Sequence, residues 1–432
     1  MRILDWNSSS STERCAALQR PALADAARIS ASTRDIVERV RREGDAALRA
    51  FTEQFDGVRL ETLAVTTAEF AAAERAVTAK QHAAIERAID NVRRFHAAQA
   101  TLPLRVETSP GVICERFSVP IRAVGLYVPA GSAPLPSTAI MLAVPAALAA
   151  CPVKLMCTAP NRSGSANPAV LVAARKAGVE HIFKVGGAQA VAAMAYGSES
   201  IPKCDKIFGP GNAYVTAAKI LVAQHAGGAA LDLPAGVTEV MVIADDEARP
   251  EFVAADLLAQ AEHSPDAQAI LVTTQPALAA AVFAEVQRQR ARLSRAAVLA
   301  ESIDSMRLIV VDKLQTAFDI ANGYAPEHLI LEIREARSWL PKVSSAGAVF
   351  LGHWSPESLG DYCSGPNHTL PTYGYARSYS GLSLEDFQRR ITVQELTPSG
   401  LKDLGPTAII LAGLEGLDAH AASVSIRLEA LQ

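Results

Sequence analysis

The feature that most constrains the fold is a regular alternation, from residue 121 onward, between short apolar runs and stretches of helical periodicity. In the first part of this region four apolar runs have the length of strands, and a helical pattern follows each of them. The four runs lie at 121–128, 153–159, 181–186 and 206–209. Strands that alternate with helices pair in parallel, because the helix carries the chain back to the end at which the strand began. The sequence therefore predicts a parallel sheet with helices on both faces.

The alternation starts again after a stretch rich in Gly and Pro at 227–237. Five further strands are predicted, and helical patterns separate them. These strands lie at 239–245, 269–274, 307–311, 328–333 and 348–352. We therefore predict an α/β protein with two doubly wound, Rossmann-like parallel-sheet units, at 121–237 and 238–382.

The segments that flank the two units lack this rhythm. Residues 1–120 carry apolar side chains at helical spacing between 13 and 100, with Gly57 as a helix stop, so we expect a helical N-terminal region. Part of that region is expected to join the second unit. The last segment, 383–432, is predicted to be a small, mostly helical tail. It is too short for a core of its own, so we expect it to dock on another surface.

Composition and charge argue against several classes of partner. The 41 Lys and Arg residues are interspersed with 45 Asp and Glu, and no basic patch suited to a nucleic-acid backbone stands out. The longest apolar stretch, 138–150, is shorter than the ~20 residues that a membrane-spanning helix needs. The N-terminus lacks the apolar segment of a secretory signal, and the six cysteines show no CxxC spacing. We expect a cytoplasmic protein with reduced thiols that binds neither nucleic acid nor membrane.

Three loops in the first unit follow predicted strands and are rich in Gly and Pro, at 127–138, 185–190 and 209–212. Such loops at the carboxyl ends of parallel strands let backbone amides approach a phosphate at a helix N-terminus. Each loop alone is more simply a tight turn, and no GxGxxG opens a βα unit. Together, on one edge of one sheet, they favour a ligand site without naming the nucleotide.

Two polar pairs in the second unit are candidates for catalysis or metal binding. Gln260 and His263 are three residues apart on a predicted helix, so they share a face and can offer an oxygen and a nitrogen to one metal. Glu327 and His328 precede an apolar run, where an adjacent acid and imidazole can both transfer protons. Taken singly, the first pair is also explained as a polar helix end and the second as a solvated loop.

Two further stretches carry residues of the same kinds. The polar loop 357–368 contains Asp361 and His368, and loops of this composition are typical of functional sites. In the tail, Glu415 and His420 are five residues apart, so one could reach a metal while the other meets a ligand amine. A solvent-exposed helix end explains the tail pair equally well.

At these residues the chain resembles histidinol dehydrogenase, from about residue 30 to residue 428. The resemblance rests on VGLYVPAGSAPLPST, KVGGAQAVAAMAYG, DKIFGPGNAYV, DLLAQAEHSPDAQ, NGYAPEHL, SLGDYCSGPNHTLPTYGYARSYSGLS, FQRRITVQEL and EGLDAHAASVSIR. It implies a zinc- and NAD-dependent enzyme that oxidises L-histidinol through L-histidinaldehyde to L-histidine, the final step of histidine biosynthesis. The alternatives are a related zinc/NAD dehydrogenase acting on another small polar alcohol, and a catalytically silent zinc- or nucleotide-binding protein.

The resemblance also implies a role for each candidate residue. Glu327 and His328 would be the proton-transfer pair. One zinc ion per subunit would be held by Gln260, His263, Asp361 and His420. NAD would contact Tyr127, Gln189 and Asn212. The substrate pocket would be lined by Thr238, Gln260, His263, His328, Asp361, Glu415 and His420.

Two further implications concern assembly and one substitution. The resemblance implies a homodimer with shared sites, in which the tail (383–432) of one subunit completes the site of the other. The chain departs from the family at Thr238, where Ser is usual, so a methyl group is added beside a retained hydroxyl.

Overall fold

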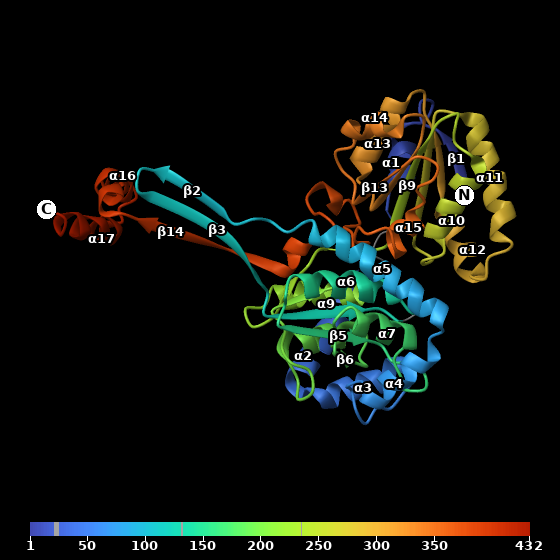
Figure 1. Ribbon diagram of the computed structural model, residues 1–432. Helices are drawn as coiled ribbons and strands as arrows, with labels where there is room; N and C mark the ends of the chain where they lie inside the picture. Colours follow the sequence, from blue (N-terminus) through green and yellow to red (C-terminus); the bar gives the residue numbers. More distant parts are fainter. Residues whose placement is uncertain (21–25, 131–132, 235) are drawn as a thin grey trace.

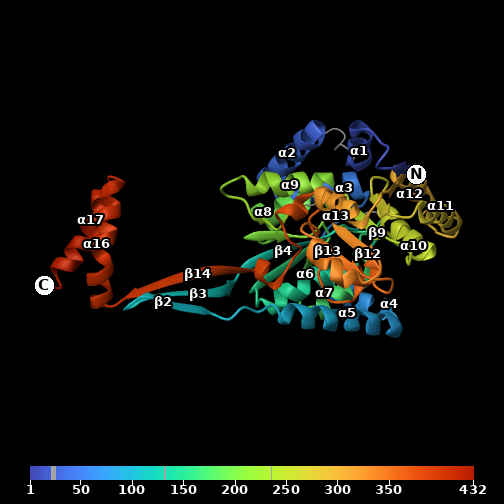
Figure 2. The same cartoon turned by 90° about the horizontal axis from the view of Figure 1, so that it is seen from above.

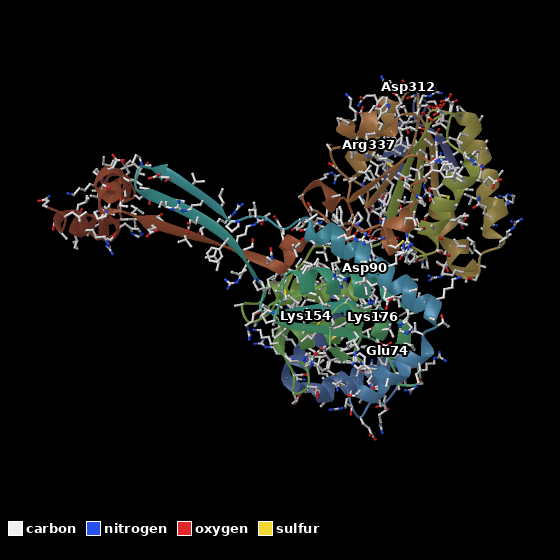
Figure 3. All side chains as sticks on the ribbon, viewed as in Figure 1. Glu74, Asp90, Lys154, Lys176, Asp312 and Arg337 are labelled. Carbon is white, nitrogen blue, oxygen red and sulfur yellow. The ribbon has the colours of Figure 1, made fainter. Side chains whose placement is uncertain are left out.

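The structure is a computed structural model that describes residues 1–20, 26–130, 133–234 and 236–432. Its elements form two α/β units that lie against each other and a long arm that projects from the first unit (Figure 1). Charged side chains of both signs are spread over the two units (Figure 3). Glu74, Asp90, Lys154 and Lys176 are labelled there on the first unit, and Asp312 and Arg337 on the second. In the described part of the chain no helix combines the length and the apolar character needed to cross a bilayer.

The first unit contains a five-stranded parallel sheet in the order β6-β5-β4-β7-β8. Its strands are β4 (Ala123–Val128), β5 (Val153–Thr158), β6 (His181–Phe183), β7 (Lys206–Phe208) and β8 (Ala230–Leu231). The helices between them are α6 (Pro136–Leu148), α7 (Pro168–Lys176), α8 (Gly187–Tyr196) and α9 (Ala213–Ala223). In chain order the strands run 3-2-1-4-5, which is the doubly wound Rossmann arrangement. The apolar runs predicted this sheet because strands covered on both faces are apolar on both faces.

The N-terminal helices complete the two covering layers of this sheet. They are α2 (Ala26–Glu43), α3 (Asp45–Asp56), α4 (Thr67–Ala76) and α5 (Ala79–Ala97). The first two pack with α8 and α9 on one face, and the last two with α6 and α7 on the other. Gly57 ends α3 in the left-handed conformation, as the sequence predicts, and Gly44 adds an interruption between α2 and α3 that the periodicity does not reveal.

The second unit contains a six-stranded parallel sheet in the order β1-β11-β10-β9-β12-β13. Its strands are β1 (Arg2–Asp5), β9 (Glu239–Ala244), β10 (Gln268–Thr273), β11 (Arg307–Val310), β12 (His328–Glu332) and β13 (Ala348–Leu351). Without β1 the order is again 3-2-1-4-5, so the two units repeat one topology. The N-terminal strand β1 pairs with β11, which places the start of the chain in the second unit.

Helices cover both faces of the second sheet. They are α1 (Ser11–Leu18), α10 (Pro250–Ala261), α11 (Pro276–Arg290), α12 (Ala296–Ser305), α13 (Leu314–Tyr324), α14 (Ala336–Trp339) and α15 (Glu357–Tyr362), with the 3-10 turns η1 (Leu340–Lys342) and η2 (Tyr375–Arg377). A third turn, η3 (Leu384–Phe387), packs instead in the core of the first unit. One core lies under α10, α11 and α12, and the other under α13 and α14. The predicted fold class of two doubly wound parallel-sheet units is therefore confirmed.

The arm corrects two expectations. Residues 104–120, expected to belong to a helical region, form β2 (Leu104–Ser109) and β3 (Val112–Pro120). The tail, expected to lack strands, begins with β14 (Gln388–Leu396), which pairs antiparallel with β3. The expectations were wrong there because β2 and β14 are largely exposed and β3 is only partly buried, so the three strands lack the one-sided apolar alternation from which strands are predicted.

Beyond β14 the tail is helical, as predicted. Helices α16 (Pro398–Leu414) and α17 (Asp418–Glu429) pack on each other at the far end of the arm, away from both units (Figures 1 and 2). Large apolar side chains of the two helices and their connection are exposed, namely Leu404, Ile410, Leu411, Leu414, Leu417 and Ile426. Exposed apolar side chains grouped in this way are typical of interaction surfaces.

Candidate active site

The central cluster lies where β9 and β12 begin. These two strands pair in parallel, and they are the strands between which the order of the second sheet reverses. Glu327 and His328 stand at the start of β12, and Thr238 and Glu239 at the start of β9. The cluster is therefore at the amino ends of the strands, whereas ligands of doubly wound sheets usually bind at the carboxyl ends.

Glu327 is buried, and its carboxylate is held by β9. The Thr238 hydroxyl donates to Glu327 Oε2 at 2.6 Å, and the Glu239 amide donates to the same oxygen at 2.9 Å. The hydroxyl of Thr238 thus makes a defined contact, and its extra methyl group does not prevent it. Burial raises the pKa of Glu327 to about 7, against the opposing effects of His328 and of these two donors.

His328 is buried beside Glu327 and is surrounded by acids. Its Nδ1 lies 3.2 Å from the Glu239 carbonyl oxygen, and its Nε2 lies 3.5 Å from Asp361 Oδ1. Glu357 Oε1 is 3.9 Å from Nδ1. Burial by itself lowers the pKa of His328, but the carboxylates of Glu357, Glu327 and Asp361 outweigh it and raise the pKa to about 10.

Three potential metal ligands converge next to this imidazole. One ligand atom each from His263, Glu357 and Asp361 lies within 4.8 Å of the other two. Gln260 joins the group, since its side-chain nitrogen donates to the Thr238 hydroxyl at 2.6 Å and the other end of its carboxamide lies 2.8 Å from Glu357 Oε1. The structure therefore brings together Gln260, His263 and Asp361, and it adds Glu357.

Glu357 was not predicted as a site residue, although it is the first residue of the polar loop 357–368 in which Asp361 and His368 were singled out. It lies four residues before Asp361 on the short helix α15, so both carboxylates point from one face of that helix. This spacing was the available signal. Burial raises the pKa of Glu357 to about 8, as expected of a carboxylate packed among other acids.

The two tail residues are not part of this cluster in the same chain. Glu415 caps the end of α16, and His420 lies in the first turn of α17. Both are exposed at the end of the arm, on the far side of the first unit from the cluster (Figure 2). A single chain therefore assembles three of the four ligands that the resemblance implies.

The three residues expected to bind coenzyme share one edge of the first sheet. Tyr127 lies near the end of β4, Gln189 in the first turn of α8 after β6, and Asn212 before α9 after β7. The Gly187 amide donates to the Tyr127 hydroxyl at 3.0 Å. The side-chain oxygen Oδ1 of Asn212 accepts from the Tyr214 and Val215 amides and so caps the N-terminus of α9. This edge is the carboxyl one, and β4 and β7 are the strands between which the sheet order reverses.

One of the loops at this edge needs a glycine, because its backbone has a positive φ and passes close to β4. Gly209 has φ +123°, and a Cβ there would lie 2.2 Å from the Tyr127 carbonyl oxygen. Of the 127–138 loop, Gly131 and Ser132 lie outside the described residues.

His368 connects the two groups of residues across the boundary between the units. Its Nε2 lies 3.5 Å from the hydroxyl of Thr138, which is in the first turn of α6 after the 127–138 loop. Asn367 beside it donates to the Met141 carbonyl oxygen of the same helix at 2.7 Å. The loop after α15 therefore links the cluster of potential metal ligands in the second unit to helix α6, which follows β4 at the carboxyl edge of the first sheet.

A Rossmann-type unit beside the buried Glu327–His328 pair and a cluster of potential metal ligands has the architecture of an α/β dehydrogenase. The family model of histidinol dehydrogenase matches residues 19–428. The chain belongs to the histidinol dehydrogenase family, which makes it an NAD-dependent oxidoreductase acting on alcohol and aldehyde groups. The resemblance seen in the sequence is confirmed.

Individual relatives agree over the whole length. The chain is 54% identical over 428 residues to the histidinol dehydrogenase of Xanthomonas axonopodis pv. citri (strain 306), covering 99% of each chain. It is 50% identical over 431 residues to that of Vibrio vulnificus (strain YJ016), covering 100% of this chain and 99% of the relative. The crystal structure of histidinol dehydrogenase from Elizabethkingia anophelis superposes with a TM-score of 0.94 at 44% identity, covering 100% of this chain and 98% of that one.

Proposed function

We propose that this chain oxidises L-histidinol through L-histidinaldehyde to L-histidine, with NAD as hydride acceptor and one zinc ion per subunit. The observation that supports the proposal most directly is that the proposed base, His328, lies beside a potential metal ligand, Asp361. Nε2 of His328 lies 3.5 Å from Asp361. A cation bound there would offset the carboxylates that raise the pKa of His328, which would free this nitrogen to accept a proton. A substrate held at the metal would present its alcohol to that nitrogen.

The residues present fit a divalent cation. The carboxylates of Glu327, Glu357 and Asp361 lie around the imidazole of His328, and His263 adds a nitrogen beside Glu357 and Asp361. Buried carboxylates in excess of their cationic partners are stabilised by a metal ion. Nitrogen and oxygen donors without a thiolate suit zinc and also accept manganese or cobalt.

The proposed ligands are Gln260, His263 and Asp361, with His420 of the partner subunit. When bound, zinc would supply positive charge and fixed attachment points for the imidazole and amine nitrogens of the substrate. Glu357 Oε1 lies 2.8 Å from the end of the Gln260 carboxamide that would face the ion, so Glu357 would help to position this ligand.

The proton transfers belong to Glu327 and His328. His328 takes the alcohol proton as hydride leaves carbon for the first NAD, which produces the aldehyde. Glu327 takes a proton from water as the water oxygen adds to the aldehyde carbon. Protonated His328 returns its proton to the aldehyde oxygen, which completes the hydrate and leaves His328 free to act as a base again. His328 then takes a hydrate proton as the second hydride leaves for a second NAD, and the carboxylate forms.

The coenzyme contacts are proposed at Tyr127, Gln189 and Asn212. Their common position at the carboxyl edge of β4, β6 and β7 supports this, because helix N-termini and backbone amides there favour a pyrophosphate. Residues 121–237 would then form the coenzyme unit and residues 238–382 the substrate unit.

The tail (383–432) is proposed to dock on a second copy of the chain. The exposed apolar faces of α16 and α17 support this, since they would be covered across a two-fold axis. Glu415 of the partner subunit would then meet the substrate amine, beside Thr238 and His328 of the first subunit. A cytoplasmic location, in which the free cysteines stay reduced, completes the proposal.

The test is NADH formation, followed by absorbance, after L-histidinol is added to the protein and NAD. We expect two NADH for each L-histidinol consumed, and turnover with L-histidinol well above that with amino alcohols that lack the imidazole. Equal turnover with such alcohols, or one NADH with release of the aldehyde, would contradict the proposed substrate and sequence of steps.

A further inference from the structure

We infer that the buried ion pair between Arg20 and Glu239 sets the geometry of the proton-transfer pair, so that both are positioning residues. The inference rests on the roles proposed above for Glu327 and His328. Neither Arg20 nor Glu239 is among the residues that would touch substrate, coenzyme or metal.

The first observation concerns the backbone of Glu239. Its amide donates to Glu327 Oε2 at 2.9 Å, and its carbonyl oxygen is 3.2 Å from His328 Nδ1. One residue thus contacts both members of the pair through its two peptide groups. A proton on Nδ1, donated to this carbonyl, leaves Nε2 as the basic nitrogen, which is the one that faces Asp361.

The second observation concerns the side chain of Glu239, which is fully buried. Arg20 grips its carboxylate with two nitrogens, Nε on Oε1 and Nη2 on Oε2, the latter at 2.9 Å. The Tyr373 amide donates to Oε1 at 3.0 Å. A planar guanidinium that contacts both carboxylate oxygens fixes the carboxylate in orientation as well as in position.

The third observation is that the same guanidinium also holds the turn before Glu327. Arg20 Nη2 donates to the Tyr324 carbonyl oxygen at 2.8 Å, and the guanidinium carbon lies 3.8 Å from the centre of the Tyr324 ring. Ala325, the next residue, is in the left-handed region with φ +55°. A non-glycine residue in that conformation costs free energy and needs support from its surroundings.

Through these contacts Arg20 fixes the starts of β9 and β12 relative to each other. It ties the start of β9, through Glu239, to the Tyr324–Ala325 turn that leads into Glu327 and β12. It comes from the segment after α1, remote in sequence from both. Removing it leaves a buried carboxylate without its cation, and that carboxylate must move toward water or take up a proton. Either change displaces the Glu239 peptide groups.

The test compares Arg20→Met with Arg14→Met. Arg14 lies in the same N-terminal segment, stacks on Trp6 and donates to the Trp6 carbonyl oxygen at 2.8 Å, but it contacts nothing in the site. Arg20→Met is expected to lower kcat for both the alcohol and the aldehyde step about 10- to 100-fold, because a displacement near 1 Å can cost that much. The KM for NAD should stay within about twofold, since the coenzyme edge is in the other unit. Arg14→Met should keep the wild-type kcat.

Three further variants separate positioning from stability. Arg20→Lys keeps the positive charge but cannot contact both carboxylate oxygens of Glu239 in the fixed geometry of a guanidinium. Its kcat should therefore lie between those of Arg20→Met and wild type. Arg20→Ala should regain part of its kcat when methylguanidinium is added at a concentration that leaves wild-type kcat unchanged. The double variant Arg20→Met/Glu239→Gln should be no worse than Arg20→Met, because the two residues act as one unit.

The kcat values are expressed per folded, metal-loaded site, from circular dichroism and zinc content, so partial unfolding does not imitate the effect. Wild-type kcat in Arg20→Met, an equal loss in Arg14→Met, or no response of Arg20→Ala to methylguanidinium would overturn the inference. Glu327→Gln and His328→Asn are measured in parallel. If both Glu327→Gln and His328→Asn keep the wild-type kcat, the proton-transfer roles proposed for Glu327 and His328 are wrong. If these two variants lose activity while Arg20→Met keeps it, only the positioning role of Arg20 is wrong.

Discussion

The Nε2 atom of His328 lies 3.5 Å from Oδ1 of Asp361, so the imidazole proposed to accept the proton lies beside a potential metal ligand. The two residues come from different elements, β12 and α15. Any substrate that binds a metal at Asp361 is thereby presented to His328, and the first two predictions depend on this relationship.

The first prediction concerns the metal. Chelation should abolish NADH formation, and added Zn²⁺ should restore it, because the four-ligand set lacks a competing thiolate. Asp361→Asn should lower zinc content, measured by atomic absorption, under conditions in which wild type is fully loaded. Full activity in a sample verified to be free of metal would contradict the proposed role.

The second prediction separates the two half-reactions. Only the aldehyde step needs an activated water, so Glu327→Gln should slow oxidation of L-histidinaldehyde more than that of L-histidinol, by about 10²-fold or more. His328→Asn should slow both steps, since the same base serves each. Stopped-flow measurement of NADH with either substrate checks this, and equal losses in both steps for Glu327→Gln would argue against the assigned roles.

The third prediction concerns stability and pH, and it involves Asp56 at the end of α3. Burial raises the pKa of Asp56 to about 6, and its Oδ2 is buried without a hydrogen-bond partner. The folded state therefore binds more proton than the unfolded state between the two pKa values, so stability falls as pH rises from about 4 to about 6. Asp56→Asn should flatten this fall and be more stable than wild type at neutral pH.

Denaturant midpoints measured across that pH window test the expectation. Asp35→Asn, which changes an exposed acid on α2, is the matched control and should follow the wild-type curve. Parallel curves for Asp56→Asn and wild type would show that Asp56 does not titrate in the folded state as expected.

The fourth prediction concerns the tail. If His420 completes the site of the partner subunit, two inactive variants should complement each other. A mixed dimer of His420→Ala and His328→Ala subunits has one site free of both changes, and purification through two different tags isolates it. We expect about half of the wild-type activity per dimer, one intact site of two. A mixed dimer that forms but stays inactive would mean that the tail serves its own subunit.

Much of the fold could be predicted because its determinants are local. Nine of the eleven strands in the two parallel sheets are short apolar runs between helical patterns, and each of the nine lies within a few residues of its predicted position. The other two, β1 and β8, lie at sheet edges and were not predicted. Burial on both faces forces that composition on a central parallel strand, so it can be read without knowing the neighbours. Pairs close in sequence, such as Gln260 with His263 and Glu327 with His328, are visible for the same reason.

Contacts between remote segments could not be predicted. Strand β14 pairs with β3 across more than half of the chain, and neither strand has a buried face that leaves a pattern. Glu357 and Glu239 drew no attention as single acidic residues, because their importance lies in what they contact.

The sequence alone determined most strands and helices of the two units, the family that the chain resembles and the side chains that can perform the chemistry. Only the tertiary structure decided that the proton-transfer pair lies at the amino ends of β9 and β12, that Arg20 from the N-terminal segment braces it, and that His420 lies far from the other three proposed ligands. The physical reason is that burial leaves its mark on neighbouring residues, whereas a hydrogen bond or an ion pair between distant residues depends on how the whole chain packs.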